Sequence, residues 1–194
     1  PEGSYPIVIA DHLLTPLGER AGEFGLKQRT AIVCDEVVGP LYGRVVVEQL
    51  DDAALIIIPA GEEHKTLDTV RHLYSEFVAA GLDRSSTVAA LGGGVVGDTA
   101  GFAAASYMRG LRFVQIPTTL LAMVDSSVGG KVGVDLPQGK NLVGAFKQPD
   151  AVLVDPQVLV TLPERQQSCG MAEIIKLGLF CDAGLLVDVE RLMA

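Results

Sequence analysis

Short, almost continuously apolar segments recur along the chain, separated by stretches of different periodicity. They lie at residues 6–10, 30–35, 55–60, 86–93, 112–118 and 151–156. A strand buried on one face would alternate apolar and polar residues, whereas these segments are apolar at nearly every position. They therefore predict the strands of a parallel sheet that is covered on both faces.

Helical periodicity separates the predicted strands. The clearest pattern has spacings near i, i+3 and i+4 and ends at Gly81. Its apolar positions are Leu67, Val70, Leu73, Phe77 and Val78. Strands that alternate with helices predict an α/β fold with a doubly wound, mostly parallel sheet, in which ligands bind at the carboxyl ends of the strands.

The pattern changes after Thr119. Residues 126–141 are rich in glycine and small polar residues, which predicts a hairpin or an ordered loop. After the last strand, a helical stretch opens at Pro163 and continues through Leu179. A further apolar stripe consists of Leu185, Leu186, Val189, Leu192 and Met193.

These patterns predict two parts of the chain. We expect a nucleotide-binding α/β domain over residues 1–156 and the beginning of a helical domain, cut short, over residues 157–194. The alternative is a terminal helix that docks back on the first domain.

Composition favours a folded protein, since 48% of the residues are apolar and 20% are charged. The three cysteines, Cys34, Cys169 and Cys181, lack the CxxC spacing of a zinc knuckle and fit reduced thiols. The chain has no basic-then-apolar leader and no apolar run of bilayer length. We therefore expect a cytoplasmic protein without membrane contact.

Charge narrows the class of partner. The net charge of −9 argues against a nucleic-acid-binding protein, which would present a basic face to phosphates. Between Gly101 and Pro149, however, cations outnumber anions. The cations are Arg109, Arg112, Lys131, Lys140 and Lys147, and the anions are Asp125 and Asp135. This local surplus predicts a basic pocket for a small anionic ligand.

Glycines mark the most informative turn. The segment 91–98, LGGGVVGD, closes a predicted strand and opens a helix. Glycine has no Cβ, so its backbone N–H groups can approach a phosphate, and the start of a helix favours negative charge. The turn therefore predicts a phosphate cradle, with close packing of a helix on the sheet as the alternative explanation.

A standard dinucleotide-binding fold would place an acid at the end of the next strand, about 20 residues after the glycines. The predicted strand at 112–118 has no acid there. Ribose contacts would instead come from Asp35, Glu62 and Lys65, which follow earlier strands at the same edge of the sheet.

Five segments resemble the 3-dehydroquinate synthase family, which belongs to the sugar phosphate cyclases. They are GGGVVGD at 92–98, YMRG at 107–110, IPTTLLAMVDSSVGGK at 116–131, GKNLVGAF at 139–146 and GMAEIIK at 170–176. The segments keep the order and approximate spacing of the family, and the resemblance runs from about Tyr5 to Leu179. It implies an α/β nucleotide-binding domain followed by a helical domain, with the active site in the cleft between them.

The resemblance also implies a cofactor and a substrate. NAD would be held by Asp35, Glu62, Lys65, Gly93, Gly94, Val95, Asp98, Thr118, Thr119, Lys131, Lys140, Thr161 and Leu162. The substrate, 3-deoxy-D-arabino-heptulosonate 7-phosphate, would be contacted by Arg109, Asp125, Lys131, Lys140, Asn141 and Lys176. Guanidinium and ammonium groups suit its carboxylate and phosphate.

Glu173 matches the family's metal-binding glutamate. The family's ion, zinc or another divalent metal such as cobalt, also takes two histidines from the helical domain and acts as a Lewis acid. In this sequence His12, His64 and His72 precede the glycine turn and lack ligand spacing, so we interpret them as surface or packing residues. A single glutamate is a poor zinc site.

The implied reaction oxidises a ring carbon with NAD, eliminates phosphate, re-reduces the carbon, opens the ring and closes it by an aldol step. The resemblance further implies a homodimer. Two other functions stay open: a metal-dependent polyol dehydrogenase and a non-catalytic NAD-binding module. Two positions depart from the family: Gln166 replaces a usual acid, and Asp135 stands where asparagine is common, a change that we expect to be tolerated.

Overall fold

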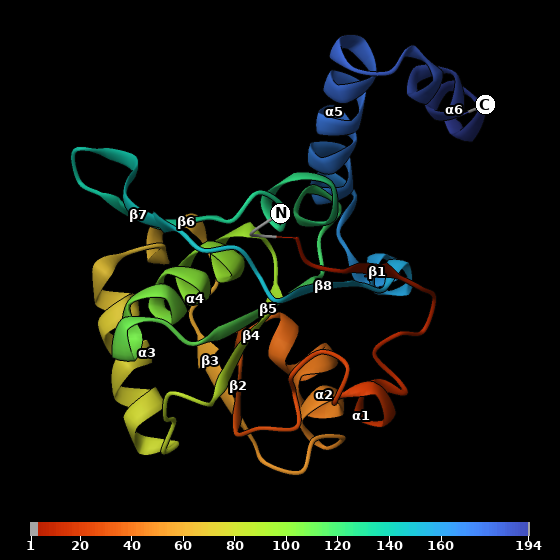
Figure 1. The fold of residues 1–194 in the computed structure, drawn as a ribbon. Helices are drawn as coiled ribbons and strands as arrows, with labels where there is room; N and C mark the ends of the chain where they lie inside the picture. Colours follow the sequence, from red (N-terminus) through yellow and green to blue (C-terminus); the bar gives the residue numbers. More distant parts are fainter. Residues whose placement is uncertain (1–3, 194) are drawn as a thin grey trace.

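The computed structural model describes residues 4–193, except for the side chain of Met193. Its centre is a six-stranded sheet with the order β1-β8-β5-β4-β2-β3, in which all neighbouring strands are parallel (Figure 1). The strands are β1 (Ile7–Ile9), β2 (Thr30–Asp35), β3 (Ala53–Ile58), β4 (Thr87–Gly92), β5 (Arg112–Pro117) and β8 (Ala151–Val154). All six predicted strands are present. β3 begins and ends two residues earlier than predicted: Ala53 and Ala54 already pair with β2, and Pro59, which cannot donate to the ladder, follows its last residue.

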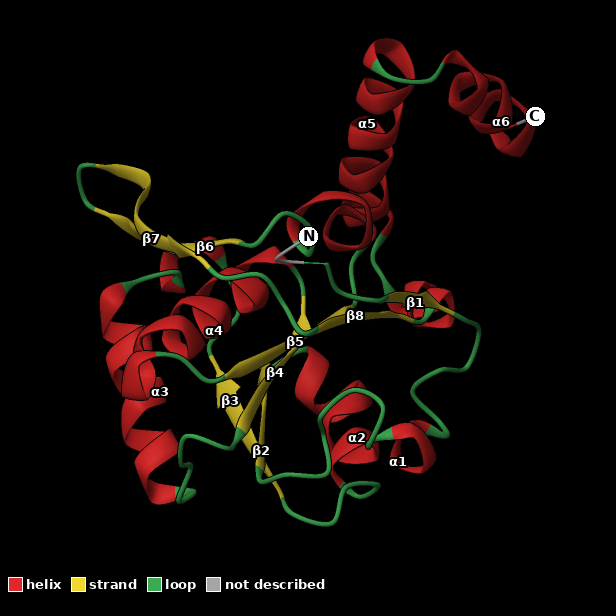
Figure 2. Ribbon diagram, in the orientation of Figure 1, coloured by secondary structure: helices red, strands yellow, loops and turns green. Residues whose placement is uncertain are grey.

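Helices cover both faces of the sheet (Figure 2). Ile32 and Cys34 of β2 face a core shared with α1 (Leu17–Arg20) and α2 (Arg44–Val47). Ala31 and Val33 face the opposite core, under α3 (Leu67–Ala79) and α4 (Gly94–Ser106). The strands are apolar at nearly every position because alternate residues enter different cores. This confirms the doubly wound α/β prediction.

Short helical turns connect these elements. They are η1 (Gly39–Gly43), η2 (Glu62–His64), η3 (Tyr107–Arg109), η4 (Ala122–Ser126) and η5 (Pro156–Thr161). The predicted helix over 67–78 is confirmed as α3, which is capped by the Thr66 hydroxyl accepting the N–H of Thr69 at 3.2 Å. Val70 and Phe77 of its apolar stripe are buried, whereas Val78 is exposed at the C-terminal end.

Helix α4 lies between the sheet and a hairpin, and its glycines permit this close approach. A Cβ at Gly97 would lie 2.8 Å from Oε1 of Gln115 on β5. A Cβ at Gly101 would lie 2.9 Å from Cζ of Phe113 and overlap Val132 of the hairpin. Tight packing on the sheet therefore explains Gly97, the last glycine of the turn motif.

The predicted hairpin is confirmed and consists of β6 (Lys131–Leu136) and β7 (Gly139–Phe146). Val132 and Val134 of β6 are buried against α4. Val134 pairs with Val143 and Leu136 pairs with Gly139, so residues 140–142 lie opposite Asp135 alone. The hairpin therefore contains a bulge in β7.

Two longer helices, α5 (Glu164–Phe180) and α6 (Ala183–Met193), project from the α/β body (Figure 1). α5 follows Pro163 as predicted, and Gly170 lets it approach η4, since a Cβ there would lie 2.6 Å from Cβ of Leu120. α6 packs on α5, where a Cβ at Gly178 would lie 2.7 Å from Cδ2 of Leu186. α6 therefore contacts α5, and Figure 1 shows it away from the sheet.

The predicted apolar stripe is covered unevenly. Val189 is buried, whereas Leu192 is 81% exposed, and Phe180 of α5 is 82% exposed. The side chain of Met193, the last member of the stripe, lies outside the described part of the chain. Among residues 4–193 there is no helix with the length and apolarity needed to cross a membrane.

Candidate functional site

The carboxyl edge of the sheet gathers most of the predicted site residues. Asp35 ends β2, Glu62 and Lys65 follow β3, Gly93 follows β4, and Thr118 follows β5. Neighbouring parallel strands end at the same edge, so residues far apart in the chain meet there. The sequence-based placement of these residues at one edge is therefore correct.

The start of α4 leaves backbone donors open. Gly93 is the N-cap residue, and within residues 4–193 no side chain caps this end of the helix. A Cβ at Gly93 would lie 3.1 Å from Cγ2 of Thr119, and one at Gly94 would lie 3.1 Å from Oγ of Ser126. The neighbouring Thr118 hydroxyl is buried and lacks a partner among the described residues. Open N–H groups, an orphan hydroxyl and the helix dipole together suit a phosphate or pyrophosphate.

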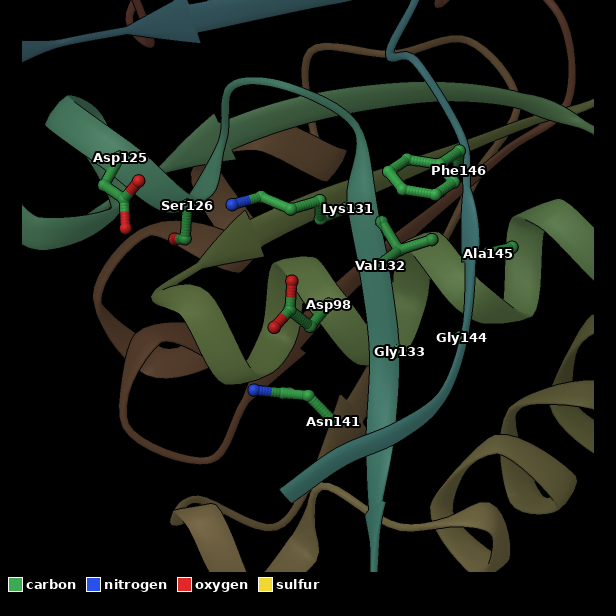
Figure 3. Close-up of a pocket in the computed structure, with 10 residues that line it drawn as sticks. All are labelled: Asp98, Asp125, Ser126, Lys131, Val132, Gly133, Asn141, Gly144, Ala145 and Phe146. Carbon is green, nitrogen blue, oxygen red and sulfur yellow. The ribbon is translucent and has the colours of Figure 1, made fainter. Parts of the chain in front are cut away.

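A cavity of about 490 Å³ lies between α4, η4 and the hairpin (Figure 3). Its polar wall contains Asp98, Asp125, Ser126, Lys131 and Asn141, and its apolar wall contains Val132, Ala145 and Phe146. Four of the five polar residues are predicted site residues, and they come from four different elements, α4, η4, β6 and β7. Lys131 is the one cation among the lining residues, and two carboxylates accompany it.

Lys65 contacts both a predicted cofactor residue, Asp98, and a predicted substrate residue, Asn141. Its side chain is 6% exposed, and Nζ lies 2.5 Å from Oδ2 of Asp98 and 2.6 Å from Oδ1 of Asn141. Burial raises the pKa of Asp98, the positive charge of Lys65 opposes that rise, and the charges of Glu62 and Asp135 add to it. Asp98 therefore binds a proton more tightly than an exposed aspartate does.

A second hollow, of about 590 Å³, lies between the η2 turn and the tip of the hairpin. Glu62 and Lys140 line it and form an ion pair, with Nζ 2.8 Å from Oε1. The hydrogen bond to Glu62 and its negative charge raise the pKa of Lys140. A predicted cofactor residue and a predicted substrate residue are thus partners of each other.

Glu173 and Lys176 form an ion pair on one face of α5. The hydrogen bond to Glu173 raises the pKa of Lys176, and the charge of Asp125 contributes to the rise. No group of three or more histidine, cysteine, aspartate or glutamate side chains is arranged for a metal in the described part of the chain. These residues therefore offer Glu173 as a single ligand and do not make a complete metal site.

Three further predicted cofactor residues lie along the same edge but have partners of their own. Asp35 accepts the N–H groups of Val37 and Val38 at 3.0 and 2.7 Å. Thr161 Oγ1 lies 2.7 Å from the Tyr42 hydroxyl. Leu162 follows Thr161 directly and donates its N–H to the carbonyl of Leu159. The side chains of Asp35 and Thr161 and the backbone N–H of Leu162 thus have partners within the chain.

Arg109 lies at the opposite edge of the sheet. It belongs to the turn between α4 and β5, and the 13 residues of α4 place this turn about 20 Å from Gly93. Arg112 begins β5 at the same distant edge, where Nη1 would lie 2.9 Å from a Cβ at Gly25. The prediction of one basic pocket is therefore wrong: α4 separates these two arginines from Lys131 and Lys140.

Sequence reasoning missed several residues of the cavity. Ser126 lies beside Gly94, and its only sequence signal is its place in a loop of small polar residues. Phe146 is 87% exposed at the cavity wall, and no periodicity in the sequence indicates it. Ser126 owes its position to η4, and Phe146 owes its position to the hairpin, because both elements fold against α4.

Comparisons with known proteins agree with this geometry. A family model described as 3-dehydroquinate synthase N-terminal matches residues 55–169. The 3-dehydroquinate synthase of Microcystis aeruginosa is 50% identical over 194 residues, which cover 98% of this chain and 53% of that protein. The chain thus spans about half the length of the curated relatives that it matches.

Solved structures give the same relationship. A valiolone synthase, ValA from Streptomyces hygroscopicus with NAD+ and Zn2+ bound, is 37% identical with a TM-score of 0.86, over 95% of this chain and 52% of that chain. A 2-deoxy-scyllo-inosose synthase complexed with carbaglucose-6-phosphate, NAD+ and Co2+ is 33% identical with a TM-score of 0.81, over 88% of this chain and 47% of that chain.

Proposed function

The chain belongs to the 3-dehydroquinate synthase family, and on that premise we propose that it forms the N-terminal, NAD-binding part of a 3-dehydroquinate synthase. The reaction converts 3-deoxy-D-arabino-heptulosonate 7-phosphate to 3-dehydroquinate and phosphate, a carbon–oxygen lyase step of the shikimate pathway. The observation that carries the proposal is the uncapped start of α4 beside the cavity that contains Lys131.

NAD fits the carboxyl edge of the sheet. The open N–H groups after Gly93 and the orphan Thr118 hydroxyl would hold its pyrophosphate, and Asp35, Glu62 and Lys65 lie along the edge where its riboses would extend. When bound, NAD supplies reversible hydride transfer at a ring carbon of the substrate. Thr161 and Leu162 complete the proposed cofactor set at the β8 side of the edge.

The sugar phosphate fits the cavity beside α4. Lys131 would bind one of its anionic groups, Asn141 would donate to a hydroxyl, and Asp125 would orient a hydroxyl by accepting its proton in a hydrogen bond. Asp98, with its raised pKa, holds a proton more readily than an ordinary aspartate. Lys140 and Lys176 would have to exchange Glu62 and Glu173 for the substrate.

Glu173 is the proposed contribution of this chain to a divalent metal site. Zinc and cobalt are bound in related cyclases, and a metal there supplies Lewis-acid polarisation of a hydroxyl. The described residues do not complete the ligand set, so we assign no step to the metal. Arg109 lies at the other edge of the sheet, so we assign it no contact with the proposed site of the same chain.

The division of the chain supports the same proposal. Residues 1–156 would form the NAD-binding domain, and residues 157–194 would begin a helical domain that contributes Glu173 and Lys176. A homodimer in the cytoplasm is the assembly and compartment that we propose for the enzyme.

A phosphate-release assay tests this function. The chain is incubated with NAD, zinc and the heptulosonate phosphate, with and without a C-terminal helical domain from a homologue. With the supplied domain we expect phosphate release without accumulation of NADH, because the hydride returns to the substrate within the turnover. The chain without that domain should release little or no phosphate. Lys131→Ala should abolish the release, and Lys147→Ala should not, because Lys147 is absent from the cavity lining.

Other outcomes would contradict the proposal. Net NADH formation on addition of a polyol would indicate a dehydrogenase instead. NAD binding without phosphate release, even with the supplied C-terminal domain, would indicate a non-catalytic NAD-binding module.

A further inference from the structure

The bulge in β7 is built from residues that belong to the proposed site. Residues 140–142 lie opposite Asp135 alone, so the regular ladder between β6 and β7 is interrupted. Asn141 adopts a left-handed conformation within this bulge, with φ of +55°. Asparagine tolerates this conformation better than most residues, yet the conformation persists only where surrounding contacts hold it.

The carboxylate of Asp135 provides such a contact. Oδ1 of Asp135 accepts the backbone N–H of Asn141 at 2.7 Å. The side chain thereby substitutes for the ladder partner that the bulge removes, and an unpaired N–H is avoided.

Asp135 is itself held from the other side. Its backbone N–H donates to the carbonyl of Lys65 at 2.8 Å, and the backbones of Thr66 and Asp135 form an isolated parallel β-bridge. Lys65 Nζ then contacts Oδ1 of Asn141 at 2.6 Å. The three residues close a ring of hydrogen bonds. The backbone N–H of Asp135 donates to the Lys65 carbonyl, the backbone N–H of Asn141 donates to the Asp135 carboxylate, and Lys65 Nζ donates to the side-chain oxygen of Asn141.

We propose that Asp135 is a positioning residue, whose carboxylate holds the bulge and fixes the Asn141 side chain at the wall of the cavity for binding of the sugar phosphate. This inference rests on the function proposed above. Asp135 does not line the cavity of Asn141, so it acts through Asn141 and not by contact with the substrate.

Two substitutions separate the acceptor from the charge. Asp135→Ala removes the acceptor of the Asn141 N–H, and Asp135→Asn keeps an oxygen acceptor without the charge. Neither substitution removes an atom of the backbone bond from Asp135 to Lys65 or of the contact between Lys65 and Asp98, so we expect both to persist. Hydrogen exchange at the Asn141 amide reports on the bulge, and the amide of residue 135 is the internal control.

Calorimetric titration with the heptulosonate phosphate gives the functional result, and it uses the NAD-bound chain complemented by the C-terminal helical domain of a homologue. We expect Asp135→Ala to weaken this binding about tenfold, the loss typical of one misplaced polar contact, and to speed exchange at the Asn141 amide. Asp135→Asn should stay within about twofold of the wild type in both measurements. The affinity for NAD should change less than about twofold in either variant, since the Lys65–Asp98 contact is kept.

A double-mutant cycle tests whether Asp135 acts through Asn141. Asn141→Gly keeps the left-handed backbone and removes the side chain. In that background Asp135→Ala should change sugar phosphate affinity less than about twofold.

The outcomes separate this inference from the proposed function. The positioning role would be overturned if Asp135→Ala bound the sugar phosphate with wild-type affinity, or if the two substitutions had additive effects in the cycle. The proposed function would still stand in either case. If the wild type does not bind the sugar phosphate while Asn141 exchange still depends on the acceptor at residue 135, the proposed function is wrong and the substrate role of Asp135 falls with it.

Discussion

The two ends of helix α4 differ in how their polar groups are satisfied. At the N-terminal end, the N–H groups after Gly93 have no capping side chain within the described residues. At the C-terminal end, the hydroxyl of Ser106 donates to the carbonyl of Phe102 at 2.6 Å and lies 2.7 Å from the Tyr74 hydroxyl. Tyr107 then packs on Tyr74 and Phe77.

Other turns at the amino edge of the sheet also have their polar groups paired by side chains of the chain itself. Asp83 accepts the N–H and hydroxyl of Ser85 and the hydroxyl of Ser86. Asp150 accepts the N–H of Phe113 at 2.9 Å, where β5 begins. The chain satisfies its own polar groups at this edge, and at the start of α4 it leaves donors for a ligand.

This difference separates structural from functional polar groups. Both ends of α4 follow from one glycine-rich and apolar sequence, 94–106, and its composition does not distinguish them. What distinguishes them is which side chains the neighbouring elements bring within hydrogen-bonding distance. Substitutions at each end therefore test whether the contrast has functional meaning.

The largest expected effect is the loss of Lys65. Lys65→Met leaves the carboxylate of Asp98 partly buried without its cation, which should lower the free energy of unfolding by about 3 kcal/mol. Urea denaturation at neutral pH measures this loss. Lys140→Met is the matched control: its ion pair with Glu62 is exposed, so a loss below about 1 kcal/mol is expected. Equal losses in the two variants would show that the burial of Lys65 has no energetic weight.

The next effect separates stability from ligand binding at the start of α4. Gly93→Asp would cap the helix and place a negative charge where the pyrophosphate is proposed to bind. We expect NAD affinity to fall about 100-fold by calorimetry, which corresponds to about 2.7 kcal/mol. Gly93→Ala controls for the 3.1 Å approach of a Cβ to Thr119. If Gly93→Asp binds NAD as tightly as the wild type does, the pyrophosphate binds elsewhere.

A smaller effect concerns the pH dependence of stability. The pKa of Asp98 is raised in the folded chain, mainly by burial, with Lys65, Glu62 and Asp135 as its charged neighbours. The native state therefore binds this proton more tightly than the unfolded state, whose aspartate pKa is about 4. As pH rises from about 4 through the raised pKa of Asp98, the stability of the wild type should fall relative to Asp98→Asn, and above that pKa the difference should become constant.

Urea unfolding of both proteins over this pH series measures that difference. A difference that is independent of pH, or that grows in favour of the wild type, would show that Lys65 dominates burial at Asp98.

The smallest effect is expected at the other end of α4. Arg109→Ala should change NAD affinity less than about twofold, because the helix separates this turn from the start of α4 by about 20 Å. Calorimetric titration of the wild type and of the Arg109→Ala variant with NAD measures this change in affinity. A larger change would mean that the two ends of α4 are coupled, and the contrast between them would no longer separate structure from function.

Much of the fold was predictable because its signals are local. The apolar strands, the α3 periodicity and the glycine-rich hairpin each depend on residues that are neighbours in sequence. The site was only partly predictable. Gly93, Gly94 and Thr118 follow their strands directly, so their edge was fixed once the strands were identified.

Other parts of the site have no local signal. Phe146 and Ser126 enter the cavity because the hairpin and η4 fold against α4. The error about the basic pocket has the same origin: Arg109 precedes β5 and Lys131 follows it, so this strand places the two residues at opposite edges of the sheet.

The sequence alone determined the strands, the principal helices, the glycine turn and the membership of a family, because hydrophobic periodicity, glycine conformation and motif order are properties of short segments. Only the tertiary structure decided which polar groups meet. Lys65 reaches Asn141, 76 residues away, and Asp98 on another element, because strand order and the hairpin bring these segments to one edge. The burial that raises the pKa of Asp98 likewise exists only in the packed chain.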